Sequence, residues 1–229
     1  MKRILAAAIA AALLLSGCTS ASRPAESAPP TGTPTGTPSP SPTPVVTPTP
    51  EPEPADDELV LVRDYIPGIF IDLKYATTDN FTGRVIYDSD EAYLRYGTVK
   101  KLLCAQNELS GRGLSLKIWD AYRPVSAQFK LWEICPNPVY VSNPNNGYSK
   151  HSRANTVDIT LVTDAGKSIP MPSGFDDFTS LADRDYSDVS AEAAENARLL
   201  ENVMVENGFV PYSGEWWHYS DSVAYDVYG

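Results

Sequence analysis

The distribution of proline divides this chain into two unequal parts. Of its 20 prolines, 12 lie before residue 57, in a stretch that from residue 19 is rich in Thr, Ser, Gly and Ala. Such a stretch has too few large apolar side chains to offset the entropy of ordering it, so it predicts a disordered tether. Residues 57–229 contain only 8 prolines and are long enough to bury a sizeable core. The fold and its functional site are therefore expected in this second part.

The first residues are typical of an export signal. A positive start at Lys2 and Arg3 precedes an unbroken apolar run at residues 4–15, which is shorter than the roughly 20 residues that span a membrane. Residues 15–18, Leu-Ser-Gly-Cys, resemble the lipobox of bacterial lipoproteins, in which the cysteine after the cleavage site carries lipid. An ordinary signal peptide with an incidental Cys18 is the alternative.

We therefore predict a lipoprotein signal peptide at residues 1–17, a tether at residues 18–56 that begins with a lipidated Cys18, and one folded domain at residues 57–229. The repeated prolines of the tether favour an extended spacer with a reach of up to roughly 100 Å. This organisation predicts an exported protein that is anchored by lipid to the extracytoplasmic face of a bacterial cell membrane.

Charge and cysteine content exclude several kinds of protein. Residues 57–229 contain 15 Lys and Arg against 25 Asp and Glu, and this acidic balance argues against a nucleic-acid partner, whose phosphates would be repelled. Two histidines and three cysteines in the whole chain exclude a Cys-rich zinc module and a dense disulfide scaffold. Cys104 and Cys135 are an even pair in an oxidising compartment, so one disulfide or two buried free thiols remain open.

The pattern of apolar residues and chain breakers predicts a mixture of helices and strands. Helices are expected over residues 90–110, 124–134 and 190–207, and strands over 114–119, 156–162 and 209–219, the last broken at Ser213-Gly214. These elements do not follow a βαβ rhythm, so we predict the α+β class with a mainly antiparallel sheet flanked by helices. In the strand over 156–162 the odd positions are apolar, so Asp158 faces the other way, towards polar surroundings.

Both histidines lie near carboxylates. His151 precedes Asp158 by seven residues, and His218 follows Glu215 by three. Two imidazoles and one carboxylate suit a zinc ion whose fourth position is left to water, and Glu215 would then accept the proton of that water. The alternative is three unrelated polar residues, each satisfied by its own hydrogen bonds, because this spacing alone is not a strong pattern.

Five stretches of the domain resemble the zinc D-alanyl-D-alanine dipeptidases associated with vancomycin resistance, which are related to D,D-carboxypeptidases. They are residues 74–83, Asp-Ala-Tyr-Arg-Pro at 120–124, 151–158, Phe-Asp at 175–176 and Glu-Trp-Trp-His at 215–218. They occur in the family's order and span about residues 60–220. The resemblance implies the zinc D-Ala-D-Ala peptidase fold, which is hedgehog-like, and one zinc ion per chain.

Carried over residue by residue, the resemblance implies a complete set of residues around that ion. It implies zinc ligation by His151, Asp158 and His218, general base and acid catalysis by Glu215, stabilisation of the developing oxyanion by Arg123, and substrate binding by Asp176, at the ammonium end, and by Tyr75 and Ser149, at the carboxylate end. A guanidinium suits the oxyanion because it stays charged and has a rigid fork of donors. Without the resemblance, a surface ion pair with Asp120 is the alternative for Arg123.

This arrangement predicts hydrolysis of free D-Ala-D-Ala in cell-wall peptide metabolism, because only a dipeptide pairs both of its charged ends. The predicted location favours a second possibility, a D,D-carboxypeptidase that trims D-Ala from peptidoglycan stem peptides. A third is a non-catalytic cell-wall binding module, against which Glu215 speaks because a binder needs no base. The expected partners are thus D-Ala-D-Ala or other peptidoglycan-derived D-amino-acid peptides.

Two positions depart from simple expectation. The family usually has glycine after His-Ser-Arg, whereas this chain has Ala154, which would be strained by roughly 1–2 kcal/mol if the position needs positive φ. In an ideal strand Glu215 and His218 would also face opposite ways, so we expect a bend or bulge near Gly214. Trp216 and Trp217 are expected to pack in the core and the pocket wall.

Overall fold

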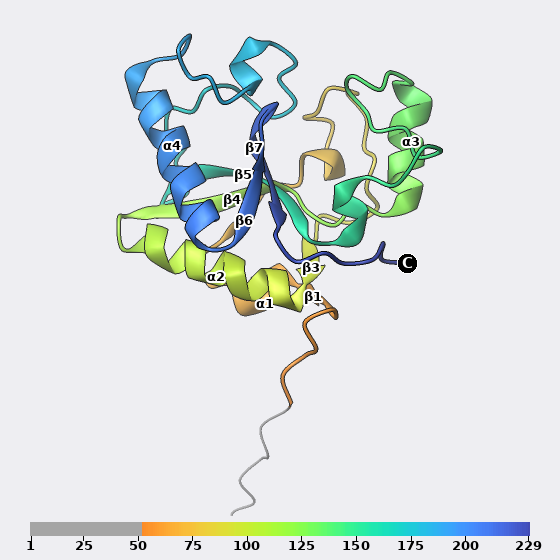
Figure 1. Ribbon diagram of the computed structural model, residues 1–229, viewed down its shortest axis with the longest axis horizontal. Helices are drawn as coiled ribbons and strands as arrows, with labels where there is room; N and C mark the ends of the chain where they lie inside the picture. The colour runs from red at the N-terminus through yellow and green to blue at the C-terminus, as the bar shows by residue number, and fades with distance from the viewer. Residues whose placement is uncertain (1–51) are drawn as a thin grey trace, which may run out of the picture. The chain divides into compact units, whose positions relative to one another are not determined.

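Residues 52–229 are described by the computed structural model (Figure 1). The predicted signal peptide, Cys18 and residues 19–51 of the predicted tether lie outside the described residues. Within residues 52–229, no helix combines the length and the apolar character that crossing a membrane requires.

A five-stranded sheet organises the described part of the chain (Figure 1). Its strands, in spatial order, are β2 (Phe70–Ile71), β4 (Leu114–Asp120), β5 (Thr156–Thr163), β7 (Glu215–Asp221) and β6 (Phe209–Tyr212). Only the short edge strand β2 runs parallel to its neighbour, and the other pairs are antiparallel. The predicted α+β class with a mainly antiparallel sheet is therefore confirmed.

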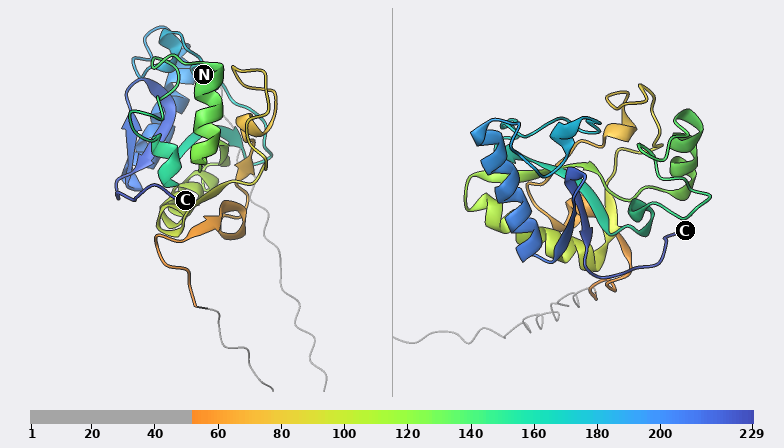
Figure 2. Two further views of the ribbon diagram at one scale, coloured as in Figure 1. Left: turned by 90° about the vertical axis from the view of Figure 1, so that its right-hand side faces the viewer. Right: turned by 45° about the horizontal axis from the view of Figure 1, so that its top comes forward.

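The helices lie on different sides of this sheet. Helices α2 (Tyr96–Ser110) and α4 (Ala191–Glu206) pack against its strands and against each other, whereas α3 (Val125–Ile134) and α4 lie on opposite sides of the sheet (Figures 1 and 2). The short helix α1 (Val62–Tyr65) packs on α2, beside a two-stranded sheet of β1 (Leu59–Leu61) and β3 (Tyr93–Arg95). Three short 3-10 helices complete the fold: η1 (Lys74–Ala76), η2 (Lys150–Arg153) and η3 (Ser180–Ala182).

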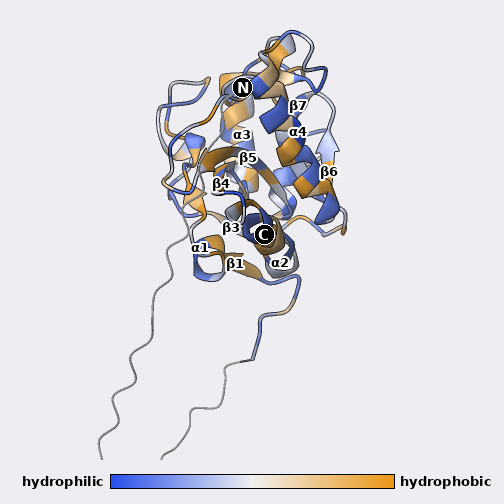
Figure 3. Cartoon of the chain, turned by 90° about the vertical axis from the view of Figure 1, so that its left-hand side faces the viewer, coloured by the Kyte–Doolittle hydropathy of each residue, from blue (hydrophilic) through white to orange (hydrophobic). Residues whose placement is uncertain are grey.

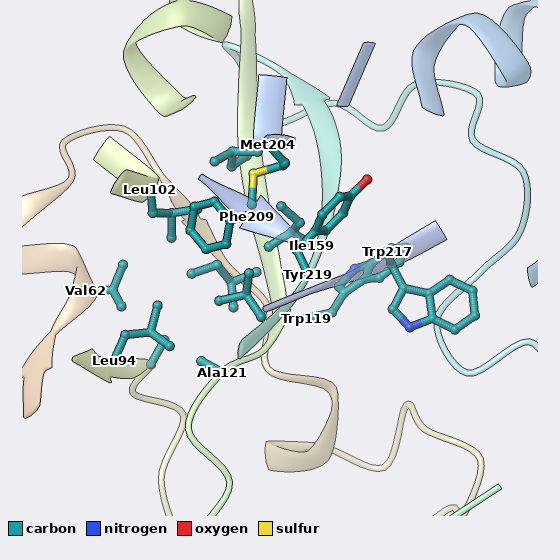
Figure 4. Packing of buried hydrophobic residues seen from close by; sticks show 14 of the residues in the cluster. Val62, Leu94, Leu102, Trp119, Ala121, Ile159, Met204, Phe209, Trp217 and Tyr219 are labelled. Atoms are coloured by element: carbon teal, nitrogen blue, oxygen red, sulfur yellow. The ribbon is translucent and has the colours of Figure 1, made fainter. Parts of the chain in front are cut away.

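The core forms where α2 and α4 meet the sheet. Helix α4 begins after Ser190, whose hydroxyl accepts the N–H of Ala193, and it has alternating hydrophilic and hydrophobic patches (Figure 3). Its Leu200 and Met204 are fully buried, and Met204 packs beside Phe209 and Ile159 of the sheet (Figure 4). Burying each such side chain contributes roughly 1.5–3 kcal/mol, so the sheet that carries the site is firmly held.

Most of the predicted elements are found, but one helix begins later than expected. The helix predicted over residues 90–110 starts at Tyr96, because residues 93–95 form strand β3. Leu94 pairs there with Val60 and is fully buried. This pairing joins residues far apart in the sequence, so local periodicity did not reveal it. The tryptophans of β7, Trp216 and Trp217, are buried as predicted.

The two cysteines of the domain are not joined. Cys104 on α2 and Cys135 after α3 are both free thiols. Cys104 is exposed and Cys135 is half-buried. Of the two alternatives, two free thiols is therefore correct, but the expectation that both thiols are buried is wrong. The fold therefore rests on its core and on hydrogen bonds.

Candidate active site

Two neighbouring strands and the turn before one of them bring the predicted metal ligands together. Asp158 of β5 lies directly opposite His218 of β7 in the antiparallel register, and His151 comes from η2, just before β5. The Nδ1 atom of His218 lies 2.9 Å from one carboxylate oxygen of Asp158, and the Nε2 atom of His151 lies 3.3 Å from the other. All three residues are buried, so the site lies inside the fold and not on surface loops.

The geometry of this trio fits a divalent metal ion. One donor atom from each residue lies within 4.8 Å of the others, and it is the one such cluster found among the described residues. The Nδ1 atom of His151 lies 2.9 Å from the carbonyl oxygen of Ala121. With the ring proton on Nδ1, this hydrogen bond leaves the lone pair of Nε2 directed towards Asp158, which is how proteins orient a metal-binding imidazole.

The charges within the trio depend on one another. Burial alone would raise the pKa of Asp158, but His151 and His218 outweigh it and hold that pKa well below its ordinary value. Burial lowers the pKa of His151, yet the carboxylates of Asp158 and Asp120 more than compensate, so its net pKa is raised. His218 differs, because burial dominates there and lowers its pKa. Asp158 therefore stays charged at neutral pH, as a metal ligand must.

Glu215 lies beside this trio at the start of β7. Its Oε2 atom is 3.4 Å from Nδ1 of His218, although an ideal strand would place the two side chains on opposite faces. The register of β6 and β7 shifts between Pro211 and Tyr212, which lies opposite Glu215, so the predicted irregularity near Gly214 is confirmed. Burial, and then the charges of Asp158 and Asp176, raise the pKa of Glu215 to about 7.

Arg184 holds this irregular segment in place, and sequence reasoning missed it. One of its terminal nitrogens donates to the carbonyl oxygens of both Glu215, at 3.1 Å, and His218, at 3.2 Å. Its Nε atom donates to the carbonyl of Tyr212, just before the turn at Gly214. A single guanidinium therefore fixes the backbone on both sides of the β6–β7 turn. Nothing near Arg184 in the sequence signals this role, because its partners lie about 30 residues away.

Arg123 makes the ion pair with Asp120 that the sequence suggested, but the pair is buried. Its guanidinium donates to Oδ2 of Asp120 through NH2 at 2.6 Å and through Nε at 3.2 Å, and to Gln128 at 2.9 Å. The Asp120 side chain is fully buried, so the expectation of a surface pair is wrong; the end of β4 lies inside the fold. The backbone N–H of Arg123 also donates to the carbonyl of His151, which connects this residue to the metal trio.

Asp120 also binds Tyr87, a further site residue that sequence reasoning missed. The Tyr87 hydroxyl donates to Oδ1 of Asp120 at 2.5 Å, and the same oxygen accepts the N–H of Ala121 at 2.9 Å. The other oxygen, Oδ2, lies 3.6 Å from Nδ1 of His151. Asp120 thus contacts Arg123 on one side and His151 on the other, and both contacts are buried. Tyr87 and His151 lie far from Asp120 in the sequence, so only the folded chain brings them together.

Asp176 and Tyr75 form a second polar pair. The Tyr75 hydroxyl donates to Asp176 at 2.7 Å, and Tyr75 is buried while Asp176 is half-buried. Burial raises the pKa of Asp176 to about 7, and the nearby charge of Asp158 adds to this effect, although the Tyr75 hydrogen bond and Arg123 act against it. Asp176 has a backbone φ of 52°, a left-handed conformation that is uncommon for residues other than glycine.

Ser149 has a structural contact that the prediction did not include. Its hydroxyl accepts the N–H of His151 and so caps η2. It also lines a cavity of about 290 Å³ together with Glu215, His218 and Tyr140. Ser149 thus faces the cavity beside Glu215 and His218, and the guanidinium of Arg123 lies over the Tyr75 ring, 5.0 Å from its centroid, beside the Tyr75–Asp176 pair.

The chain matches the peptidase family Peptidase M15, D-Ala-D-Ala dipeptidase, over residues 55–226. It belongs to this family. It is 38% identical to the D-alanyl-D-alanine dipeptidase of Escherichia coli (strain K12) over 162 residues, which cover 71% of this chain and 83% of that protein. Identity to the D-alanyl-D-alanine dipeptidase of Enterococcus faecium is 34% over 176 residues, or 68% and 87% of the two chains. For the one of Enterococcus faecalis it is 33% over 185 residues, or 72% and 91%.

Ala154 is strained in this member of the D-Ala-D-Ala dipeptidase family. Its φ of 58° and ψ of 28° place it in the left-handed region, directly after η2, and its side chain is fully buried. Position 154 therefore does need a positive φ, as the prediction of strain required. Alanine costs about 1–2 kcal/mol there relative to glycine, which has no Cβ. Despite that cost, His151 stays within the trio, so other contacts must hold the turn.

A chain of aromatic rings joins the cavity of this dipeptidase-family domain to the Tyr75–Asp176 pair. Tyr140, in the cavity wall, packs 4.4 Å from Phe178, measured between ring centroids, and Phe178 packs 5.4 Å from Phe81. Phe81 in turn packs against Tyr75. Tyr140 and Phe178 are exposed, and sequence reasoning did not single them out. These rings bring three separate loops together beside the candidate active site.

Proposed function

We propose that this chain is a zinc-dependent D,D-dipeptidase that hydrolyses D-alanyl-D-alanine. The observation that carries the proposal is the buried trio of His151, Asp158 and His218, with Glu215 beside it. Family membership and relatives that are named D-alanyl-D-alanine dipeptidases support the same activity. Two imidazole nitrogens and one carboxylate oxygen are a donor set that zinc prefers, which supports zinc over harder ions that prefer oxygen.

The trio would hold the ion, and Glu215 would handle the proton. When bound, zinc supplies a water of lowered pKa and polarises the peptide carbonyl. Glu215 accepts a proton from the attacking water and returns it to the nitrogen of the leaving D-Ala, so no covalent intermediate with the protein is needed. Glu215 lies 3.4 Å from His218 and lines the cavity, which places it between the trio and the cavity.

Arg123 would stabilise the negative oxygen that develops on the peptide carbonyl. Asp120 and Gln128 occupy three of its five N–H groups, which leaves one on each terminal nitrogen for the substrate. Burial lowers its pKa, but Asp120, Tyr87 and Tyr75 together outweigh burial, so the pKa is raised well above its usual value. The cation is thus positioned before the substrate arrives, and such preorganised charge is a large contribution to catalysis.

Asp176 would bind the ammonium end of the dipeptide. Among the described residues its close partner is the neutral hydroxyl of Tyr75, so its negative charge has no built-in cation in direct contact. A substrate ammonium would supply one, with charge-assisted hydrogen bonds. Ser149, which lines the cavity beside Glu215 and His218, would contact the carboxylate end, whereas Tyr75, expected there as well, donates its hydroxyl to Asp176 at the ammonium end. A longer peptide would pair only one of its ends and leave part of this charge uncompensated.

A comparison of two substrates tests this proposal directly. With the zinc-loaded full chain, release of D-Ala from D-Ala-D-Ala is expected to be at least about 100-fold more efficient than from a stem pentapeptide, because only the dipeptide pairs with Asp176. Preference for the pentapeptide would instead identify a D,D-carboxypeptidase. A chain that binds no zinc and cleaves neither peptide would favour a non-catalytic cell-wall binding module.

We propose, from the sequence of the first 56 residues, that the enzyme works outside the cytoplasm on a lipid tether. Its substrates there would be D-amino-acid peptides derived from peptidoglycan. Fractionation of cells that express the full chain or its Cys18→Ser variant tests this. The full chain is expected in the membrane fraction and the variant outside it, and equal distributions would exclude a lipid anchor at Cys18.

A further inference from the structure

The turn that carries His151 contains two unfavourable features. Ala154 adopts a left-handed backbone conformation and closes the turn by donating its N–H to the carbonyl of His151 at 3.0 Å. Within the described part of the chain, the hydroxyl of Ser152 is the one buried side-chain polar atom without a hydrogen-bond partner. Strained segments of this kind persist only when their surroundings hold them in place.

Arg95 holds this turn from one side. Its backbone N–H donates to the carbonyl of Ala154 at 2.8 Å, and its Nε donates to the carbonyl of Arg153 at 3.1 Å. Its terminal nitrogens donate to the carbonyls of Asp57 and Asp226. Arg95 is buried, and none of the partners found for its guanidinium in residues 52–229 is a carboxylate. This buried cation therefore serves to bind backbone segments together.

The C-terminal strap, residues 222–229, holds the same turn from the other side. After β7 it extends away from α4 to the end of the chain (Figure 1). The N–H of Tyr228 donates to the carbonyl of Ser152 at 2.9 Å, and Arg153 donates to the carbonyl of Tyr225 at 2.7 Å. The guanidinium of Arg95 lies over the Tyr228 ring, 4.7 Å from its centroid, within the range of a cation–π contact.

We infer that Arg95 and the C-terminal strap form a clasp that keeps the His151 turn in its metal-binding conformation. This inference rests on the metal site proposed above. The contacts found for Arg95 are with the backbone and with aromatic rings, and none is with Asp158 or His218. Arg95 is therefore a positioning residue. Its side chain holds the carbonyl of Arg153 and, through the carbonyl of Asp226, the strap. Loss of that side chain lets the strained turn relax and moves one ligand away from the other two, whereas the backbone N–H of residue 95 that binds Ala154 stays in every variant.

The affinity for zinc tests the clasp without any measurement of catalysis. In competition with a chromophoric chelator, the metal-free full chain with Arg95→Ala is expected to bind zinc about 10–100-fold more weakly than the wild type, as for other residues that support a ligand. Arg95→Lys should give little recovery, because an ammonium cannot reproduce the planar fork of donors. Arg112→Ala, which removes an exposed arginine paired with Glu108 on α2, is the matched control and should leave affinity unchanged.

A second substitution separates positioning from general damage. Adding Ala154→Gly to Arg95→Ala should restore zinc affinity to within about 3-fold of the wild type, because glycine adopts the left-handed conformation without strain. If Arg95→Ala does not fold, Tyr228→Pro replaces it, since it removes the N–H bound to Ser152, with Tyr228→Phe as its control. Tyr228→Pro should then weaken zinc binding, and Tyr228→Phe should not.

The outcomes are distinguishable from those of the proposed function. A wild-type chain that binds no zinc would overturn the metal site itself. A wild type that binds zinc, with Arg95→Ala or Tyr228→Pro binding it equally well, would overturn the clasp alone. Weak binding by Arg95→Ala that Ala154→Gly does not restore would also overturn it, because the loss would then be unrelated to the strained turn.

Discussion

Asp158 and Asp176 lie in the same candidate site but have opposite electrostatics. Burial acts on both in the same direction, yet the pKa of Asp158 is far below its ordinary value and that of Asp176 is raised to about 7. The difference comes from their partners, because two imidazoles flank Asp158 whereas Asp176 has the hydroxyl of Tyr75. In the first half of the site, called the complete half, the chain itself supplies the imidazoles that keep Asp158 charged. In the second, the incomplete half, Asp176 has no cation in direct contact among residues 52–229 until the ammonium of a substrate arrives.

The largest expected effect concerns Glu215, whose pKa responds to both carboxylates. Glu215→Ala should lower kcat by about 10³-fold or more, because it removes the group that moves the proton. Zinc content should stay at one ion per chain, since Glu215 is not a ligand. Turnover and metal analysis on the same sample check this. Loss of zinc together with activity would show that Glu215 belongs to the metal-binding half.

Removal of one metal ligand from the complete half is expected to have the next largest effect. His151→Ala removes one donor of the trio and one of the two groups that keep Asp158 charged, so zinc affinity should fall by at least about 100-fold. Chelator competition measures it, with exposed Arg112→Ala as the control. Normal zinc occupancy in His151→Ala would contradict the assignment of ligands.

Breaking the incomplete half should affect the substrate and spare the metal. Asp176→Asn keeps the shape and an acceptor for Tyr75 but removes the charge, so KM for D-Ala-D-Ala should rise by about 10–100-fold, as expected for a lost charged hydrogen bond. Zinc affinity should not change. Steady-state kinetics and chelator titration separate the two effects. A fall in kcat with KM unchanged would argue against ammonium binding at Asp176.

The smallest expected effect is on stability, and it follows from the raised pKa of Asp176. The native carboxyl keeps its proton up to about pH 7, whereas in the unfolded chain it loses it near its ordinary value of 3.8, so this group makes the protein less stable as pH rises through that window. In the metal-free chain, Asp176→Asn should match the wild type at pH 4 and be more stable by about 1 kcal/mol at pH 8. Denaturant unfolding at both pH values measures this difference. Equal stability of the two proteins at pH 8 would show that folding does not raise the pKa of Asp176.

Sequence patterns were sufficient for elements whose signals are local. The β-branched alternation over residues 156–162 predicted β5, and Ser190 and Gly208 marked the two ends of α4 closely. The conditional prediction of strain at Ala154 also held. Strand β3 was missed because its partner, Val60, lies 34 residues before Leu94, and a helical pattern cannot reveal such a pairing.

Only part of the candidate site could be predicted from the residue types and their spacing. Spacing suggested His151, Asp158 and His218 without deciding for a metal, and the roles of Arg123 and Asp176 came from the family resemblance. Arg184 and Arg95 were not found, because each binds backbone carbonyls that are distant in the sequence. A residue that recognises only backbone leaves no paired side chain for sequence reasoning to detect.

The attachment of Arg184 to the carbonyls of both Glu215 and His218 has a mechanical consequence. The proton acceptor and one ligand are coupled through a single rigid group, so thermal bending of the β6–β7 hairpin moves them in the same direction. Their separation is then preserved, while the pairing of β7 with β5 keeps His218 opposite Asp158. A fluctuation that would separate two independently supported groups therefore leaves the proton acceptor and this ligand at the same spacing.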